Sequence, residues 1–257
     1  MSIELAFETL GQGPPLVLLH GLFGSGTNWR SVAKHLSDVH TVYIVDQRNH
    51  GASPWADSMG YLEMADDVRR FIEQQGLQRP AVMGHSMGGK TAMALALLYP
   101  GNVGPLVVVD IAPVAYADTL TPFAEAMRSV DVLAAASRTE VQRRLAPMLP
   151  DPTLAPFLMQ NLVMRNDHFD WRINLGVISA SMAQLSDFPK PLHGLQFQRP
   201  LHAIVGARSD YVRAHDGSPF APMFTRVKTE VVADAGHWVH ADQAQAFVAA
   251  LRRALGH

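Results

Sequence analysis

The chain has 257 residues, of which 48% are hydrophobic and 17% charged, a composition typical of a soluble globular domain with a substantial core. With 21 Lys and Arg residues against 23 Asp and Glu residues, the net charge of -2 offers no attraction for nucleic acid or for an anionic membrane surface, and we expect neither partner. The absence of cysteine excludes disulfides, a thiolate nucleophile and sulfur-ligated zinc.

The amino-terminal segment, MSIELAFETLGQGPP, lacks the basic and apolar regions of a signal peptide. No stretch of the sequence has the uninterrupted apolar length of a membrane-spanning helix. These two observations predict a cytoplasmic protein.

Short apolar runs alternate with helical patterns along most of the chain. An opening hairpin is expected over residues 3–10, with its turn at residues 11–13. The predicted buried strands cover residues 14–20, 41–46, 80–84, 105–110, 200–206 and 228–233. Amphipathic helices are expected at residues 28–36, 61–75, 87–99 and 241–255. This alternation predicts an α/β fold with a mostly parallel sheet and helices on both faces.

Residues 112–189 break the alternation. This interval has no convincing β run, and Ala, Leu, Met and Phe recur in it at helical spacing. We interpret it as a helical cap inserted between two core segments, residues 1–111 and 190–257.

The run GHSMGGKT at residues 84–91 fits two signatures. Gly84, Gly89 and Lys90 match a phosphate-binding loop, whereas G-x-S-x-G describes a nucleophile elbow centred on Ser86. The run follows the third buried strand, while a phosphate loop usually follows the first, and no base-reading motif lies downstream. A P-loop NTPase is therefore the remote alternative, in which Lys90 binds phosphate; otherwise Lys90 is expected to be solvated.

The elbow interpretation makes further demands, and the sequence meets them. The sharp turn requires small residues on both sides of the nucleophile, and GHSMG supplies glycine at both places. The backbone N–H of Met87 and a second donor from the HGLFGS loop, residues 20–25, can hold an oxyanion. An acid and then a histidine must follow in the sequence. Ser86, Asp110 and His237 have that order.

The blocks HGLFGSGTNW, DQRNHGASP, GHSMGG, VVVDIAP and GHWVHAD together resemble the α/β-hydrolase superfamily, and within it the small YbfF-type esterases. The resemblance implies an eight-stranded sheet, a helical cap after the sixth strand, and hydrolysis of an acyl ester or thioester without a cofactor or metal. It also implies Leu22 as the second oxyanion donor. Phe23 and Trp238 are expected to line the substrate pocket.

The position of the acid is open to two interpretations. Hydrolases of this fold usually carry the acid in a G-x-x-D turn after the seventh strand, but here the turn reads GARS and places Ser209 there. Asp210 is one residue late. Asp110, at the end of the neighbouring strand, can also reach Nδ1 of His237. We favour Asp110 and keep Asp210 as the alternative acid.

Other functions are compatible with the same residues. The fold also supports carbon–carbon bond hydrolysis, lactone opening and perhydrolysis, and without catalysis it can serve as a small-ligand receptor. We call the HGLFGS loop, residues 20–25, the oxyanion loop. His20 is expected to hold this loop in place, and His85 to pack within the elbow. We expect the partner to be a small-molecule ester or thioester, and the protein to be a monomer or a homodimer.

Overall fold

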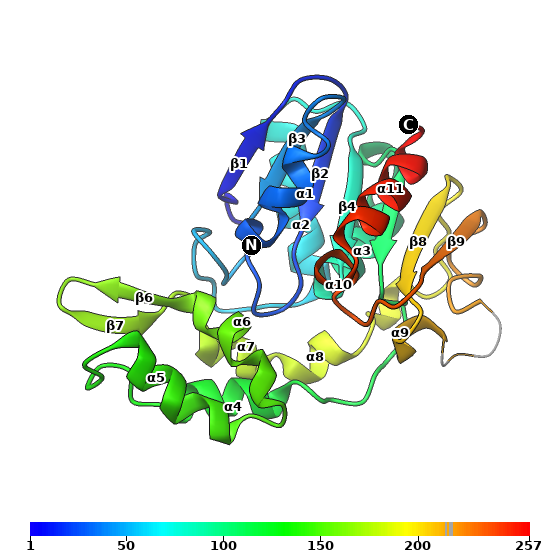
Figure 1. The fold of residues 1–257 in the computed structure, drawn as a ribbon. Coiled ribbons are helices and arrows are strands. Elements are labelled where there is room, and N and C mark those ends of the chain that lie inside the picture. The colour runs from blue at the N-terminus through cyan, green and yellow to red at the C-terminus, as the bar shows by residue number, and fades with distance from the viewer. Residues whose placement is uncertain (214, 216–217) are drawn as a thin grey trace.

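A sheet of seven strands forms the centre of the computed structural model, which describes residues 1–213, 215 and 218–257 (Figure 1). The strands lie in the order β1-β3-β2-β4-β5-β8-β9, and every neighbouring pair in the described chain is parallel except β1 with β3. They span Phe7–Leu10 (β1), Pro15–Leu19 (β2), Thr41–Val45 (β3), Ala81–His85 (β4), Leu106–Val109 (β5), Leu201–Gly206 (β8) and Val227–Val232 (β9).

The mostly parallel sheet is confirmed, whereas the expected eighth strand and opening hairpin are not found in the described residues. Strand β1 pairs antiparallel with β3 instead of folding back on β2. The reason is that both edges of β2 already pair with parallel neighbours, β3 on one side and β4 on the other. The first strand must therefore pair at the outer edge of β3, where all four of its residues are solvent-exposed.

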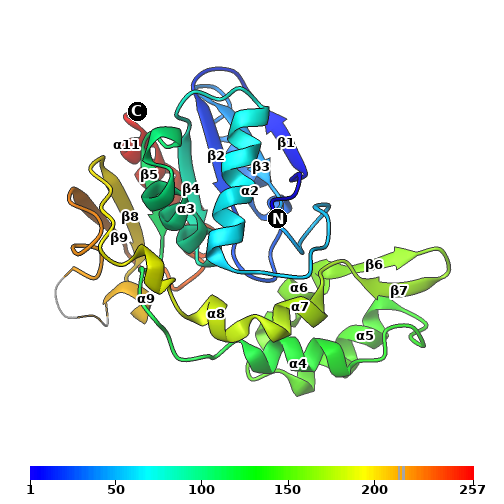
Figure 2. The same ribbon diagram turned by 180° about the vertical axis from the view of Figure 1, so that it is seen from behind.

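Helices cover both faces of the sheet, as Figures 1 and 2 show from opposite sides. One face packs against α2 (Tyr61–Gln74) and α3 (Met87–Leu98), and the other against α1 (Arg30–Lys34) and α11 (Ala244–Leu255). Short helices complete this part of the chain: η1 (Gly26–Trp29), η2 (Pro100–Asn102), α9 (Asp210–Arg213) and α10 (Val239–Asp242). Helix α3 packs on the central strands of the sheet and against α2 beside it, and residues 87–97 are all buried (Figure 2).

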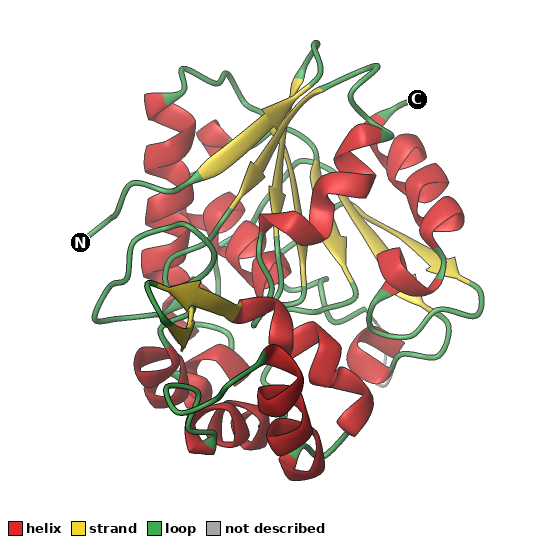
Figure 3. Ribbon diagram, turned by 60° about the vertical axis from the view of Figure 1, so that its left-hand side comes forward, coloured by secondary structure: helices red, strands yellow, loops and turns green. Residues whose placement is uncertain are grey.

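A layer of short helices lies across one end of the sheet (Figure 3). It comprises α4 (Thr121–Ser129), α5 (Arg138–Leu145), α6 (Ala155–Leu158), α7 (Leu175–Ala180) and α8 (Met182–Ser186), with η3 (Ala146–Met148), η4 (Pro152–Leu154), η5 (Met159–Asn161) and η6 (Lys190–Leu192). We call residues 112–189 the cap; η6 follows it directly in the chain. The limits of the cap and its separation from the core remain predictions.

The expectation that the cap holds no strand is wrong. Strands β6 (Leu162–Arg165) and β7 (His168–Trp171) form an antiparallel hairpin within it. The two-residue turn is possible because Asn166 adopts a positive φ of 52°, which Asn tolerates better than most residues. Each strand has only four residues, too few for the alternation to stand out from the helical pattern around it. No helix in the described part of the chain has both the length and the apolar character needed to cross a membrane.

The loop after β3 is anchored by a buried ion pair. The Arg48 guanidinium and the Asp67 carboxylate of α2 are 2.6 Å apart and have almost no exposure to solvent. Asp67 also accepts the backbone N–H of Ile3 at 2.7 Å, so the pair connects the amino terminus, the loop and α2. A buried carboxylate that loses its partner is strongly destabilising.

We therefore expect Arg48→Met to lower the free energy of unfolding by about 3–5 kcal/mol, measured by urea denaturation. The matched control is Arg30→Met, because Arg30 pairs with Glu8 in solvent and its loss should change stability little. Equal losses of unfolding free energy in the two variants would show that the buried pair stabilises the fold no more than the exposed pair does.

Candidate active site

Ser86 occupies a strained turn between β4 and α3. Its φ of 52° and ψ of -120° lie outside the conformations that most residues adopt. The turn brings backbone atoms so close that a Cβ added to Gly84 would lie 2.0 Å from the carbonyl oxygen of Gly88. A Cβ added to Gly88 would lie 2.5 Å from the carbonyl oxygen of Leu19. Only glycine fits at both positions, as the elbow interpretation requires.

Asp110 directly follows β5, and it contacts His237, which lies in the loop between β9 and α10. The imidazole Nδ1 of His237 lies 2.8 Å from Oδ2 of Asp110. The Asp110 side chain is completely buried, and the His237 side chain is 16% exposed. Because a carboxylate only accepts hydrogen bonds, Nδ1 carries the proton and Nε2 is left with its lone pair. The ring of Tyr211 stacks on the imidazole, with centroids 4.1 Å apart.

The two candidate acids lie in different surroundings. Ser209, which occupies the usual place of the acid, donates its hydroxyl to Oδ2 of Asp110. The backbone N–H of Gly206 donates to Oδ1 of the same carboxylate at 3.0 Å. Asp210 begins α9 and is exposed. The carboxylate that contacts His237 is thus that of Asp110, and its catalytic role belongs to the proposal below.

Two backbone amides beside Ser86 are free to act as donors. Within the described residues, neither Leu22 nor Met87 has a hydrogen-bond partner for its N–H. The next amide, that of Phe23, donates to Nε2 of His50 at 3.2 Å. Phe23 has a positive φ of 59°, which turns the loop at this point. The two N–H groups that the sequence predicts as oxyanion donors are therefore unpaired in the described chain.

Neutral histidines hold the oxyanion loop in place. His20 donates from Nδ1 to the Gly21 carbonyl at 2.8 Å and accepts the N–H of Gln47 on Nε2 at 3.0 Å. Burial lowers the pKa of His20, and burial together with the nearby His20 lowers the pKa of His50 to about 3. Both rings are neutral at pH 7, so each can accept one N–H and donate another. His20 does pin the loop, as the sequence suggested.

His85 connects the elbow to the segment that carries His237. Its Nε2 donates to the backbone carbonyl of His237 at 2.9 Å, and burial lowers its pKa well below the usual value. The rings of His85 and His237 have centroids 4.7 Å apart. The expected packing role of His85 is compatible with these contacts, which fix His237 through its main chain.

Lys90 is buried, and the expectation that it is solvated is wrong. Its Nζ donates to the carbonyl oxygens of Ser186 at 3.0 Å and Asp187 at 2.8 Å, and lies 4.7 Å from the ring centroid of Tyr116. The physical reason is that α3 is enclosed on all sides, so its first turn faces the end of the cap instead of water. The amine is engaged by protein carbonyls, which leaves it poorly placed to bind a nucleotide phosphate.

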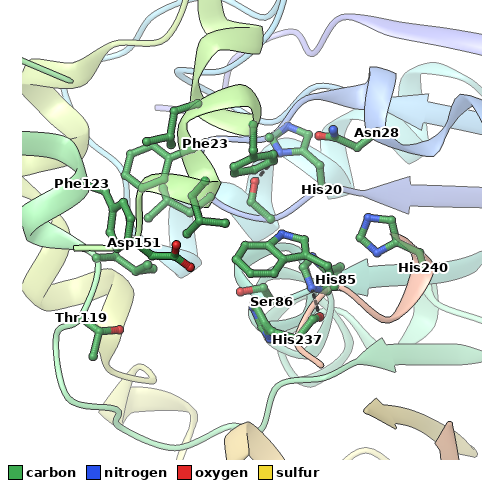
Figure 4. A pocket seen from close by; sticks show the side chains of 18 of the residues that line it. His20, Phe23, Asn28, His85, Ser86, Thr119, Phe123, Asp151, His237 and His240 are labelled. Carbon is green, nitrogen blue, oxygen red and sulfur yellow. Dashed lines mark hydrogen bonds between the residues drawn. The ribbon is translucent and has the colours of Figure 1, made fainter. Parts of the chain in front are cut away.

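Ser86 and His237 open onto one pocket of about 370 Å³ between the core and the cap. Figure 4 shows Ser86, His85 and His237 close together, with Phe123 and Asp151 of the cap across from them. Phe23 and Trp238, the predicted pocket residues, both line it. Most of the wall is apolar, and it includes Leu22, Leu120, Leu154, Phe157 and Leu158. In the described chain, no cluster of three His, Asp or Glu side chains is arranged to bind a metal.

Some residues near the site had no signal in the sequence. Asn161 of the cap is buried and donates from Nδ2 to the carbonyl of Phe23 at 2.8 Å, so it ties the cap to the oxyanion loop. Tyr211 has no motif that predicts its stacking on His237. The carbonyls that receive Lys90 are main-chain atoms, which have no residue-type signature.

The comparisons with known proteins agree with this geometry. A family model described as alpha/beta hydrolase fold matches residues 14–147. The chain belongs to the α/β-hydrolase family. The sn-1-specific diacylglycerol lipase ABHD11 of Xenopus laevis is 39% identical over 251 residues, which cover 93% of this chain and 78% of that protein.

The resemblance to YbfF-type esterases within the α/β-hydrolase family is also confirmed. Esterase YbfF of Escherichia coli strain K12 is 33% identical over 243 residues, covering 94% of this chain and 92% of that esterase. A solved structure titled "Marine microorganism esterase" has 36% identity and a TM-score of 0.93, and covers 98% of this chain and 99% of that one.

The buried amine of Lys90 predicts a pH dependence of stability. Burial lowers its pKa to about 7, although Asp187 opposes the change, and the facing rings of Tyr61 and Tyr116 have pKa values raised by burial. In the unfolded chain a lysine keeps its proton until about pH 10.4. Between these values the unfolded chain binds more protons, so the free energy of unfolding should rise with pH.

We expect Lys90→Met to remove this rise, measured by urea denaturation at about pH 7 and about pH 10. The control is Lys34→Met, because Lys34 is exposed on α1 and its loss should leave the slope as in the parent protein. A slope that persists in Lys90→Met would mean that other groups cause it.

Proposed function

We propose that this protein is a serine hydrolase that cleaves carboxylic esters or thioesters through an acyl-enzyme on Ser86. The observation that carries the proposal is the 2.8 Å contact between Asp110 and Nδ1 of His237, with Ser86 and His237 on the wall of the same pocket. Similarity to proteins named as an esterase and a diacylglycerol lipase supports ester hydrolysis. The apolar pocket wall suits a substrate with an apolar group.

The first step is acylation of Ser86. His237 Nε2 takes the hydroxyl proton while the serine oxygen bonds to the ester carbonyl carbon. The carbonyl oxygen becomes an oxyanion, which accepts hydrogen bonds from the backbone N–H groups of Leu22 and Met87. Each such donor contributes on the order of 3 kcal/mol to the stability of the transition state. The carbon–oxygen bond to the alcohol then breaks, and His237 gives its proton to the departing oxygen.

The second step releases the acid. A water molecule gives a proton to His237 and bonds to the acyl carbon, and Ser86 leaves with that proton restored. Throughout both steps Asp110 keeps the imidazole in the tautomer with its proton on Nδ1 and stabilises the transient imidazolium. The donors from Ser209 and Gly206 hold the carboxylate in position for this. A thioester follows the same sequence with a thiol as the leaving group.

The same residues support other acyl chemistry on this fold. Carbon–carbon bond hydrolysis, lactone opening and perhydrolysis would each use the same nucleophile and base, and a panel of such substrates against simple esters separates them. A non-catalytic receptor for small ligands would not need a serine in a strained turn beside a histidine–carboxylate pair. Failure of a serine-reactive probe to label the protein would favour the receptor.

Ser86→Ala is expected to abolish covalent labelling by a fluorophosphonate probe at neutral pH, because the nucleophilic oxygen is lost. Its kcat for a simple ester should fall by about 10⁴-fold or more. Mass spectrometry of the labelled parent protein should place the adduct on Ser86. Labelling or full turnover that persists in Ser86→Ala would contradict the assignment of the nucleophile.

Asp110→Asn and Asp210→Asn separate the two candidate acids. We expect the first to lose about 10⁴-fold in kcat, because an amide at this position favours the wrong tautomer of His237. The second should stay close to the parent enzyme, because Asp210 is exposed at the start of α9. Steady-state kinetics with one ester measures both. A larger loss in Asp210→Asn would reverse the choice of acid.

A further inference from the structure

Two cavities meet at Ser86, and they differ in size and in the residues beside the nucleophile. The large pocket, of about 370 Å³, has His237 on its wall. A second pocket of about 40 Å³ has Met87 on its wall. Leu22 and Ser86 line both, so the two cavities adjoin at the reacting atoms.

The chemistry of acylation assigns a role to each cavity. His237 must give its proton to the departing oxygen, so the leaving group has to lie on the side of His237, which is the large pocket. The oxyanion lies at the amides of Leu22 and Met87. The acyl chain extends from the same carbon in the remaining direction, past Met87 and into the small pocket.

The small pocket limits the acyl group by its volume. A cavity of about 10–15 Å³ is just large enough to hold one water molecule. A pocket of about 40 Å³ therefore accommodates only a few non-hydrogen atoms. We propose that the protein hydrolyses esters of short acids, of roughly two to four carbons, with larger apolar alcohols or thiols. This substrate class rests on the proposed function of Ser86 and specifies which half of the ester is small.

Lys90 holds one wall of the small pocket in place. Its amine binds the carbonyls of Ser186 and Asp187, where the chain leaves α8. Within the described residues no carboxylate forms an ion pair with it, so its donors serve these main-chain oxygens. Lys90 is a positioning residue in this scheme, since it fixes a wall and does not touch the reacting atoms.

Hydrogen bonds from two tyrosines further restrict expansion of this wall. The hydroxyl of Tyr61 donates to the carbonyl of Leu185 at 2.6 Å. The hydroxyl of Tyr116 donates to the carbonyl of Tyr211 at 2.6 Å and accepts the N–H of Ala112 at 2.9 Å. A longer acyl chain would have to break such bonds, and forcing extra methylenes into a packed space is unfavourable.

The large pocket offers what an apolar leaving group requires. Phe23 of the oxyanion loop and Phe123 of the cap line it (Figure 4), and Phe157 of the cap lines it as well. Burial of apolar area against these rings stabilises the bound alcohol. Every methylene that enters this pocket should therefore raise kcat/KM.

The parent enzyme is tested with two ester series. In 2-naphthyl esters the leaving group is constant, and kcat/KM for the octanoate should be at least about tenfold lower than for the butyrate, because the chain has no room. In acetates the acyl group is constant, and octyl acetate should exceed ethyl acetate at least about tenfold, since burying two of the six extra methylenes is enough. Octanoate cleaved as well as butyrate would overturn the proposal.

Variants then test which cavity sets each preference. Leu185→Ala enlarges the small pocket, and Lys90→Met keeps a long side chain but removes the amine; each should raise the octanoate-to-butyrate ratio of kcat/KM several-fold. The matched control is Phe157→Ala in the large pocket, which should lower the octyl-to-ethyl ratio and leave the acyl ratio unchanged. These ratios do not respond to a general loss of activity.

The outcomes separate this proposal from the proposed function. An acyl ratio that changes in Phe157→Ala but not in Leu185→Ala would place the acyl chain in the large pocket and overturn the inference, while Ser86 remained the labelled nucleophile. Leu185→Ala keeps this test decisive if Lys90→Met does not fold. Ester hydrolysis that survives in Ser86→Ala would instead contradict the proposed function itself.

Discussion

The strained backbone at Ser86 is the constraint on which the rest of the site depends. A serine with φ of 52° between a strand and a helix exposes its hydroxyl at the end of the sheet, but it brings the two flanking segments into van der Waals contact. Glycine at positions 84 and 88 relieves that contact. The same turn starts α3 at Met87, whose N–H is left without a hydrogen-bond partner in the described chain.

A consequence of this geometry is that α3 has to be buried. The helix that follows Ser86 packs against the central strands and against α2, and its first turn is fully buried, so a lysine there cannot reach water. Lys90 satisfies its amine with carbonyls from the end of the cap. Asn161 of the cap donates to the carbonyl of Phe23 in the loop of residues 20–25. The cap thus contacts the core at both Lys90 and Phe23, and it contributes to the walls of both cavities.

Most of the core could be predicted from the sequence because its signals are local. Buried parallel strands appear as apolar runs, and amphipathic helices as periodic ones, so the boundaries of β3, α2 and α3 were predicted to within a residue or two. Pairing is not local, which explains why the sequence suggests a hairpin between β1 and β2 although β1 pairs with β3. The cap hairpin has no clear signal in the sequence because its strands are short and surrounded by helical patterns.

The residues around Ser86 show the same division. Glycines at 84 and 88 were predictable, since the elbow motif itself expresses the close contact of two backbones. The enclosure of Lys90 was not, because it depends on carbonyls almost 100 positions away in the chain. A helical position suggests a solvated lysine only if one face of the helix is known to reach water. In α3, every residue of the first turn is buried, so no face of that turn reaches water.

The topology of the sheet explains how two positions far apart in the sequence, Asp110 and Asp210, can both be candidates for the acid that contacts His237. Strands β5 and β8 are parallel neighbours, so both end at the same edge, and a residue after either strand can reach Nδ1 of His237. With Asp110 after β5, the turn after β8 no longer has to supply a charge. It has to satisfy a fully buried carboxylate, because a buried charge is stable only when donors surround it. Ser209 and the N–H of Gly206 meet that requirement together with His237. The serine in GARS is therefore the complement of an acid carried by the adjacent strand, and an aspartate at the same place would set two carboxylates against each other.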